Sequence, residues 1–262
     1  MEQKPLLTHF FIALSIFLSF GCLHYPDDVI RMELPHIEEG DNVIEYTGFT
    51  LCYDEKYHLP RWVAYELTAE ETSGPYSRTG IPYQQDPSTI LLQADRHDYD
   101  APEWSRGHMA PAGDFKWDNQ AMKETFFMTN ICPQNADLNN GDWKKLEEKV
   151  REVALKFGNV YVVMGPVIGK NVYGTIGFHQ VVVPDAFYKA LLVFDGEQYI
   201  SIAFLMMNTP EPRHLKDCAL SVNDLEKITG IDFFVDLDDS FEEAIEDTKD
   251  LKAWKVFLNE KK

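Results

Sequence analysis

Basic residues are scarce in this chain of 262 residues, where 24 Lys and Arg stand against 43 Asp and Glu and the formal net charge is −19. This balance argues against tight, sequence-specific binding to a polyanion, because such affinity comes largely from cations that neutralise phosphates. Extensive disorder is not expected, since 45% of the residues are apolar and can fill a complete core. With no internal repeat, the composition predicts one large α+β domain.

A hydrophobic run long enough to span a bilayer comfortably is also missing. The longest candidate extends from Phe10 to Phe20 and has the length of a signal-peptide core. It follows Lys4 and ends at Gly21-Cys22, as in the signals of bacterial lipoproteins, although Ser19 stands where Leu is usual. We predict a lipoprotein-type signal peptide at residues 1–22 and an exported, envelope-anchored protein that meets the membrane through a lipid on Cys22. A plain cleaved signal, giving a periplasmic or secreted protein, and an uncleaved anchor are the alternatives.

Cysteine is the third scarce feature, with 4 in the chain. If Cys22 is acylated, Cys52, Cys132 and Cys218 remain, and an odd number argues against a complete disulfide framework. We expect buried thiols, and one disulfide among them stays open as an alternative.

Proline and acidic residues without periodicity predict a tether at residues 23–46, followed by a folded domain at residues 47–262. Within the domain, the long irregular connection from Glu70 to Ser105 indicates a functional loop. Hydrophobic periodicity predicts the regular elements. The expected strands are Thr47–Asp54 and Arg61–Ala69, which form a hairpin, then Phe126–Ile131, Val160–Met164, Gln180–Val183, Ala186–Phe194 and Tyr199–Met207; the expected helices are Asn140–Phe157, Asn223–Thr229 and Phe241–Phe257.

Two short segments carry side chains suited to chemistry on a phosphodiester. His108 can act as a general base, because an imidazole with a pKa of about 6.5 accepts a proton at neutral pH. Asn139 offers a carboxamide oxygen, a hard ligand for Mg²⁺, and its alternative role is to cap the following helix. Between Glu103 and Lys156 the basic residues nearly balance the acidic ones, so this region can still accept a phosphate.

Glu147 and Arg151 lie four residues apart and therefore on one face of the predicted helix. Glu147 would orient a metal-bound water and Arg151 would bind a phosphate oxygen. The alternative is an ordinary exposed ion pair worth under about 1 kcal/mol. Arg106 stands close to His108 but is expected to point to the other side of an extended strand, so that it reaches a phosphate only if the backbone bends. Trp143, on the same helix, is expected to pack in the core.

These segments resemble the sugar-non-specific DNA/RNA endonuclease family. The family signature is Asp-Arg-Gly-His, an apolar residue and Ala-Pro-Ala, and residues 105–112 read Ser-Arg-Gly-His-Met-Ala-Pro-Ala. Ser105 thus replaces the usual Asp, which puts in doubt how the loop or Arg106 is held. Further matches are Thr129–Gln134, Leu138–Trp143 with Leu146, Glu147 and Arg151, Trp62–Leu67 and Thr229–Phe234.

The resemblance implies a ββα-metal (His-Me finger) fold with a central, mostly antiparallel sheet and flanking helices. It implies that His108 is the general base and that Asn139 is the sole direct protein ligand of one Mg²⁺, with Mn²⁺ as the alternative ion. Glu147 would hold metal-bound waters, while Arg106 and Arg151 would stabilise phosphate charge and Asn130 would support the site.

The expected function is metal-dependent hydrolysis of DNA and RNA, bound through the phosphate backbone with little sequence specificity. Three alternatives stay open: a catalytically weak or silent nuclease-fold protein that binds nucleic acid, a phosphodiesterase of small nucleotides, and a structural envelope lipoprotein. Activity lost with the metal or with His108 would separate the first prediction from the silent and the structural alternatives, whereas a phosphodiesterase of small nucleotides would use the same groups in a closed pocket.

Overall fold

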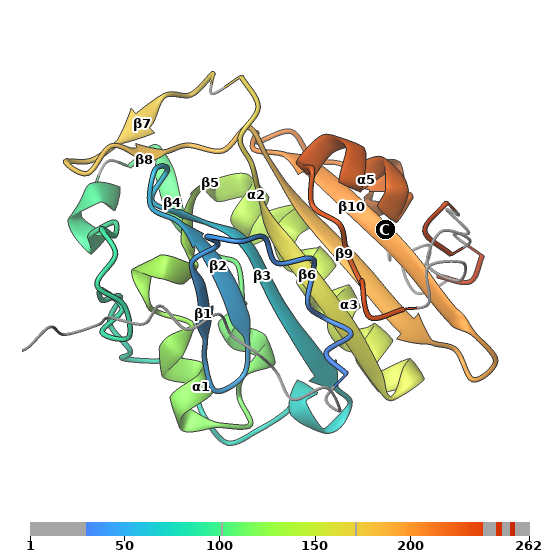
Figure 1. Ribbon diagram of the computed structural model, residues 1–262. Helices are drawn as coiled ribbons and strands as arrows, with labels where there is room; N and C mark the ends of the chain where they lie inside the picture. The colour runs from blue at the N-terminus through green and yellow to red at the C-terminus, as the bar shows by residue number, and fades with distance from the viewer. Residues whose placement is uncertain (1–29, 101, 171, 238–244, 248–251, 255–262) are drawn as a thin grey trace, which may run out of the picture. The chain divides into compact units, whose positions relative to one another are not determined.

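The computed structural model describes residues 30–100, 102–170, 172–237, 245–247 and 252–254 (Figure 1). The predicted signal peptide and most of the predicted helix at Phe241–Phe257 lie outside these residues. Within the described part, none of the helices combines the length and the apolar character that crossing a membrane requires.

A seven-stranded sheet forms the centre of the folded unit, and every neighbouring pair of its strands is antiparallel. In spatial order the strands are β1 (Val43–Glu45), β2 (Thr50–Asp54), β3 (Leu59–Thr68), β6 (Asn159–Val167), β9 (Ala186–Phe194), β10 (Tyr199–Met207) and β11 (Ala219–Leu220). Two smaller antiparallel pairs are β4 (Trp104–His108) with β5 (Ile131–Asn135), and β7 (Thr175–Ile176) with β8 (Val181–Val182). The expected α+β class with a mostly antiparallel sheet is confirmed.

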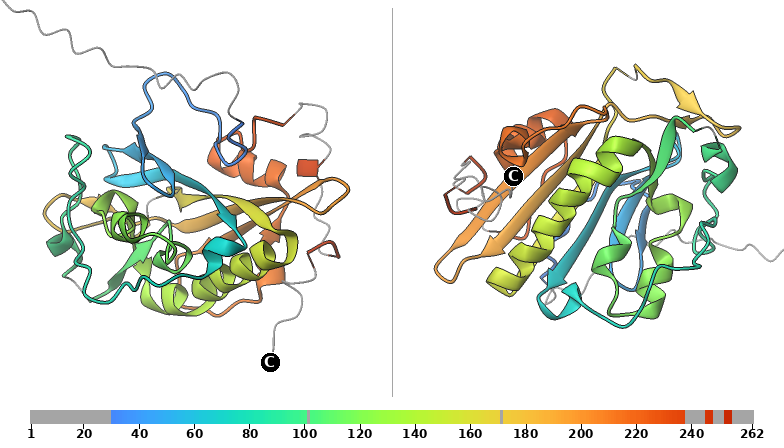
Figure 2. Two further views of the ribbon diagram at one scale, coloured as in Figure 1. Left: turned by 90° about the horizontal axis from the view of Figure 1, so that it is seen from below. Right: turned by 180° about the vertical axis from the view of Figure 1, so that it is seen from behind.

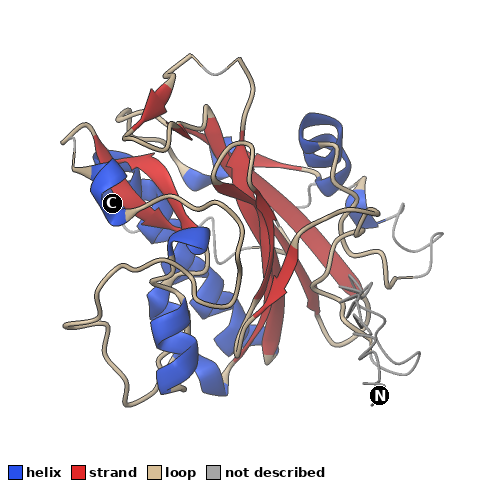
Figure 3. Ribbon diagram, turned by 60° about the vertical axis from the view of Figure 1, so that its left-hand side comes forward, coloured by secondary structure: helices blue, strands red, loops and turns tan. Residues whose placement is uncertain are grey.

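Helices cover both faces of this sheet, as Figure 3 shows with the strands seen nearly edge-on. They are α1 (Asn119–Glu124), α2 (Ala136–Leu138), α3 (Lys144–Phe157), α4 (Leu215–Cys218) and α5 (Val222–Thr229), with short 3₁₀ turns η1 (Glu70–Thr72), η2 (Arg96–Tyr99), η3 (Ala112–Asp114) and η4 (Met128–Asn130). The views in Figure 2 place α3 and α5 on opposite faces. The stripe of Leu146, Val150 and Val153, all fully buried, attaches α3 to the sheet.

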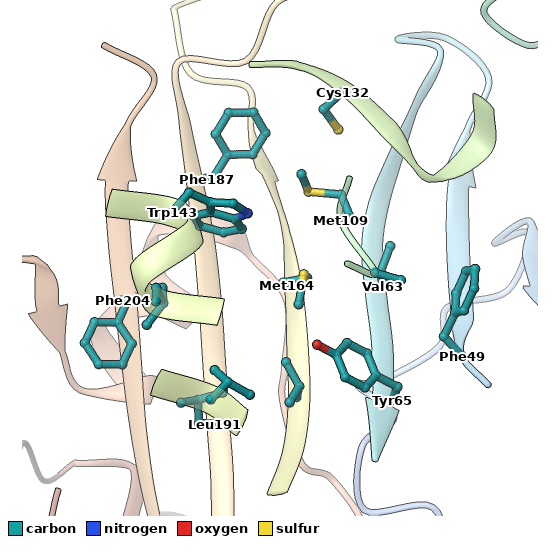
Figure 4. Close-up of a cluster of buried hydrophobic side chains, with 14 of the residues drawn as sticks. Phe49, Val63, Tyr65, Met109, Cys132, Trp143, Met164, Phe187, Leu191 and Phe204 are labelled. Carbon is teal, nitrogen blue, oxygen red and sulfur yellow. The ribbon is translucent and has the colours of Figure 1, made fainter. Parts of the chain in front are cut away.

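The strand β9 has both of its faces buried, which explains its nearly continuous apolar sequence. Phe187 packs on Trp143 of the helical segment, with ring centroids 5.7 Å apart (Figure 4). Tyr188 packs on Phe233 on the other side, also at 5.7 Å. Successive side chains of a strand point to opposite faces, so the two contacts belong to two cores. Trp143 has no exposed surface, which confirms its predicted packing role. The thiols of Cys52, Cys132 and Cys218 are buried as expected.

The hairpin predicted from Thr47–Asp54 and Arg61–Ala69 is confirmed as the antiparallel pair of β2 and β3. The tether predicted at residues 23–46 is wrong from Arg31 onward, because the folded unit begins there and β1 pairs with β2, while residues 23–29 lie outside the described part of the chain. Met32 and Leu34 are each 6% exposed, so these apolar side chains fix a segment whose composition resembles that of a linker.

The strand predicted at Phe126–Ile131 is wrong as well. Residues Met128–Asn130 form the 3₁₀ turn η4, and β5 begins only at Ile131. The buried apolar side chains that suggested a strand pack into the core from a turn instead. Its Asn130 side chain binds backbone groups from another segment, and this contact cannot be deduced from periodicity.

Candidate active site

A cavity of about 650 Å³ brings all five predicted site residues together, namely Arg106, His108, Asn139, Glu147 and Arg151. Five basic side chains line it, and Glu147 is the one acidic residue among the described residues of its lining; the basic ones are Arg78, Arg106, Lys116, Lys144 and Arg151. The local charge is thus positive although the chain as a whole is strongly acidic. An anionic ligand fits this cavity.

His108 is the last residue of β4 and forms a wall of the cavity together with aromatic side chains. Its ring contacts Phe126 edge-on, with centroids 4.8 Å apart, and Tyr83 at 5.4 Å. Burial, with a smaller contribution from Arg78, lowers the pKa of His108 to about 3. Nε2 is buried without a hydrogen-bond partner, so proton exchange with the cavity falls to Nδ1. The imidazole is therefore neutral at physiological pH, the form a general base requires.

The turn after His108 is fixed by two neighbours. Asn130 accepts a hydrogen bond from the Ala110 amide (2.8 Å) and donates to the Ala110 carbonyl (3.0 Å), so that it holds the backbone two residues after His108. Gly107 lies against the side chain of Gln134 across the ladder, and a Cβ there would come within 2.7 Å of the Gln134 Cβ. Glycine is thus needed for close packing of β4 on β5.

Asn139 lies in a π-helical turn, η5 (Asn139–Trp143), that kinks into α3 at Gly141. Its Nδ2 donates to Ser105 Oγ (2.9 Å), and Ser105 Oγ donates in turn to the carbonyl of Gln134 (2.8 Å). The alternative helix-cap role is wrong, because α3 begins after Trp143 without a side-chain cap and Asn139 has helical backbone angles itself.

The hydrogen bond from Asn139 to Ser105 also determines which atom of Asn139 can bind a metal ion. Because Nδ2 is occupied by Ser105, the amide orientation is set and Oδ1 is left as the hard oxygen donor. No cluster of three or more His, Cys, Asp or Glu suited to a metal exists among the described residues. A site with one protein ligand and a shell of water suits Mg²⁺, which keeps several waters, so the residues present fit the group.

Arg151 is anchored by a residue that sequence reasoning missed. Its Nη1 donates to Asp114 Oδ1 (2.6 Å), and Tyr65 donates to Asp114 Oδ2 (2.8 Å). Asp114 has no exposed surface. The alternative of an ion pair between Glu147 and Arg151 is not what the structure has, since Glu147 forms no ion pair with any described residue. Asp114 lies two residues after the Ala-Pro-Ala segment, but nothing in the spacing linked it to Arg151.

Arg106 lines the same cavity as His108, contrary to the expectation that it points away. Residues two apart on a strand share a face, so no bend is needed. Its guanidinium lies over the Tyr83 ring at 5.4 Å, and Nη2 donates to the carbonyl of Arg96 (2.7 Å). Arg78 also lines the cavity, and the sequence did not single it out because it lies in an irregular loop. Its side chain is exposed, and its guanidinium lies 5.5 Å from the centroid of the Phe126 ring.

Comparison with known proteins identifies relatives along most of the chain. A family model described as DNA/RNA non-specific endonuclease matches residues 32–240. "Nuclease EXOG, mitochondrial" from Danio rerio is 39% identical over 219 residues, which cover 78% of this chain and 63% of that protein. "Nuclease C1" from Cunninghamella echinulata var. echinulata is 32% identical over 212 residues, 74% of this chain and 83% of that one.

A solved structure of the EndoG/EndoGI complex contains a similar chain, with a TM-score of 0.73 and 26% identity over 81% of this chain and 92% of that one. The predicted ββα-metal fold is thereby confirmed. This chain spans 57% to 63% of the length of the EXOG relatives that it matches.

The expected bacterial envelope lipoprotein is contradicted by these comparisons. Relatives from Danio rerio, Homo sapiens and Bos taurus are named as mitochondrial nucleases and not as bacterial envelope proteins. The expectation depended on the apolar run from Phe10 to Phe20 and on Gly21-Cys22 after it, in a signal where Ser19 already departed from the usual pattern.

The site and the comparisons agree over the same residues. The family match includes both walls of the cavity, from His108 on β4 to Arg151 on α3. Nucleases of this family use a divalent metal ion, and the residues here fit one. The chain therefore belongs to the DNA/RNA non-specific endonuclease family.

Proposed function

We propose that this protein is a Mg²⁺-dependent endonuclease that hydrolyses phosphodiester bonds of DNA and RNA with little sequence specificity. The observation that carries the proposal is the convergence of His108 and Asn139 on one cavity that also holds five basic side chains. A neutral base, an oxygen donor for a cation and several positive charges are the groups that phosphodiester hydrolysis requires.

His108 is the general base in this proposal. It takes a proton from the attacking water at Nδ1, the ring nitrogen left for exchange with the cavity. Its aromatic surroundings keep it unprotonated before the reaction, while the phosphate that it faces stabilises the imidazolium afterwards. Asn130 and Gly107 keep the ring at its place by fixing the turn on either side.

Asn139 holds the divalent ion through Oδ1, with Ser105 fixing the amide from behind. When bound, Mg²⁺ or Mn²⁺ polarises the phosphate and stabilises the departing oxygen. Glu147, in the same cavity, accepts hydrogen bonds from water around the ion.

Two arginines stabilise the negative charge of the phosphate. Arg106 and Arg151 are both held by neighbours, Arg106 through the Arg96 carbonyl and Arg151 through Asp114, so that their guanidinium groups are positioned before substrate arrives. Contacts of this kind recognise the backbone common to DNA and RNA and carry no base information. Low sequence specificity follows.

The test is degradation of closed circular plasmid and of RNA by the full-length chain, with Mg²⁺ and with EDTA. A circle has no ends, so its cleavage requires internal attack. We expect His108→Ala to lower the rate by about 10²-fold or more and Asn139→Ala to abolish the response to Mg²⁺. Glu152→Gln, which alters an exposed ion pair on α3, is the matched control.

Cleavage that survives EDTA, or a His108→Ala variant as active as the wild type, would refute the proposal. Binding of nucleic acid without cleavage would favour the catalytically silent alternative. Hydrolysis of small phosphodiesters with intact plasmid would favour a nucleotide phosphodiesterase.

A further inference from the structure

A lysine with no exposed surface lies in the apolar strand β9, beside Trp143 of the helical segment that leads into α3. Lys189 is paired in register with Met164 of β6 and Phe204 of β10. Its Nζ lies 3.4 Å from Met164 Sδ and 4.9 Å from the centroid of the Trp143 ring. Among the described residues it forms no ion pair. A buried ammonium costs several kcal/mol unless an opposite charge is close, so its presence needs an explanation.

The nearest explanation lies one helical turn beyond Trp143. Residues four apart share a helix face, so Glu147 follows Trp143 on the row that Lys189 approaches. Phe187, two residues before Lys189 on the same face of β9, also packs on Trp143 (Figure 4). The ammonium therefore approaches the carboxylate from the core, while the cavity borders the carboxylate on the other side.

The fully buried carboxylate of this region, Asp114, is already matched by Arg151 and Tyr65. Neither Glu147 nor Lys189 forms an ion pair with a described residue. Burial raises the pKa of Glu147 to about 7; Lys189 opposes this most strongly, Asp114 adds to it, and Arg151 and Arg78 oppose it. Burial lowers the pKa of Lys189 to about 8, against the effects of Glu147 and Asp114 and with that of Arg151.

We infer that Lys189 is the buried counter-ion of Glu147, a positioning residue that favours the charged form of this carboxylate and directs it into the cavity. Lys189 contacts neither substrate nor ion and acts through Glu147 only. The inference deepens the proposed function, because an ionised Glu147 is what orients water around the cation there. A purely structural role, in which the stem of Lys189 fills space beside Trp143, is the competing account.

A double-mutant cycle in urea, without metal or nucleic acid, separates the two accounts. The variants are Lys189→Met, which keeps the length of the side chain without its charge, Glu147→Gln, and both together. If the charges interact, Lys189→Met changes the unfolding equilibrium constant at least tenfold more in the Glu147 background than in the Gln background, or 1.4 kcal/mol. Additive effects within twofold overturn the inference.

Failure of Lys189→Met to fold is also informative. The double variant then folds if the unmatched carboxylate was the cause, and an unfolded double variant overturns the inference. Lys189→Arg, which keeps the charge, should retain most of the coupling.

A pH profile provides the second readout. Without Lys189 the carboxylate of Glu147 protonates at higher pH, so the pH at which Mg²⁺ affinity falls by half should rise by about one unit or more in Lys189→Met. An unchanged profile contradicts the inference. A chain that shows the coupling but cleaves no nucleic acid would refute the proposed function and leave the counter-ion in place, so the two failures are distinguishable.

Discussion

The cavity has two walls that differ in whether a buried ionisable group has a partner of opposite charge. We call them the β4 wall, which contains His108, and the α3 wall, which contains Arg151. On the β4 wall, His108 lies among Phe126 and Tyr83 and is held neutral. On the α3 wall, Arg151 forms an ion pair with Asp114, which has no exposed surface. Burial is common to both walls, and the presence of an opposite charge decides the outcome. Under the proposed function, one wall supplies a neutral base and the other fixed charges.

The largest expected effect comes from breaking the charged wall at Asp114. Asp114→Asn leaves the Arg151 guanidinium without its buried carboxylate and weakens the bond from Tyr65. Removal of one partner of a buried pair costs about 3 kcal/mol or more. We expect the free energy of unfolding in urea to fall by that amount, and nuclease activity to fall with it.

Glu152→Gln is the control for Asp114→Asn, because it breaks the more exposed pair between Lys149 and Glu152 on the same helix. Such pairs contribute under about 1 kcal/mol. If the two variants lose equal stability, the contrast between buried and exposed charges on α3 is not real.

Because His108 on the β4 wall is neutral, we expect the stability of the protein to depend on pH in the acidic range. The pKa of His108 is about 3 in the folded protein and about 6.5 in an unfolded chain. Between these values the unfolded state binds the extra proton, so the free energy of unfolding decreases as pH falls below about 6.5. Linkage puts the contribution of this one group at about 2 kcal/mol by pH 5.

His108→Gln, which cannot titrate, isolates that contribution. We expect the wild type to lose about 2 kcal/mol more than this variant between pH 8 and pH 5, measured by urea unfolding at each pH. Parallel curves for the two proteins would show that the ring is hydrated and that the β4 wall is not apolar in solution.

Local patterns predicted the elements that depend on local contacts. The hairpin of β2 and β3 and the helix α3 follow from alternation and from helical spacing. The turn η4 does not, because Asn130 bonds to Ala110, twenty residues away. The start of the folded unit was missed for a similar reason: Arg31 bonds to Asp236 across 205 residues.

The site shows the same division. The convergence of His108, Asn139, Glu147 and Arg151 on one cavity was predictable, because the segments that carry them resemble the family signature. Asp114 was not, since its partner lies 37 residues further on, and a single carboxylate after a turn has no distinctive pattern. Lys189 was not either, because a lysine within an apolar strand predicts only an edge or a break in the pattern, not a buried charge.

A smaller effect is expected where the two walls meet, at Ser105. Ser105→Ala removes the acceptor for Asn139 Nδ2 and the donor to the Gln134 carbonyl. Loss of a group that orients a metal ligand lowers affinity by about tenfold. We expect that loss in Mg²⁺ titrations by calorimetry.

Ser77→Ala is the matched control, because Ser77 also lines the cavity but bonds only to Thr79 among described residues. Ser105→Asp restores the residue usual in the family. Wild-type affinity in both Ser105 variants would show that the position is idle and that Asn139 is oriented by the backbone alone.

The smallest effect is expected at Arg78, the exposed cation that stacks on Phe126 at the edge of the β4 wall. Arg78→Ala should weaken binding about equally for all sequences and reduce the slope of log affinity against log salt by about 1, because one phosphate contact is lost. It should also raise the pKa of His108, since Arg78 contributes to lowering it. The stability that the protein loses at acidic pH would then shrink toward the loss expected for His108→Gln.

Lys170→Ala, at an exposed lysine outside the cavity lining, is the control. It should change neither the salt slope nor the loss of stability at acidic pH. If Arg78→Ala alters the salt slope but not the acid response, the neutrality of His108 is due to the aromatic wall alone.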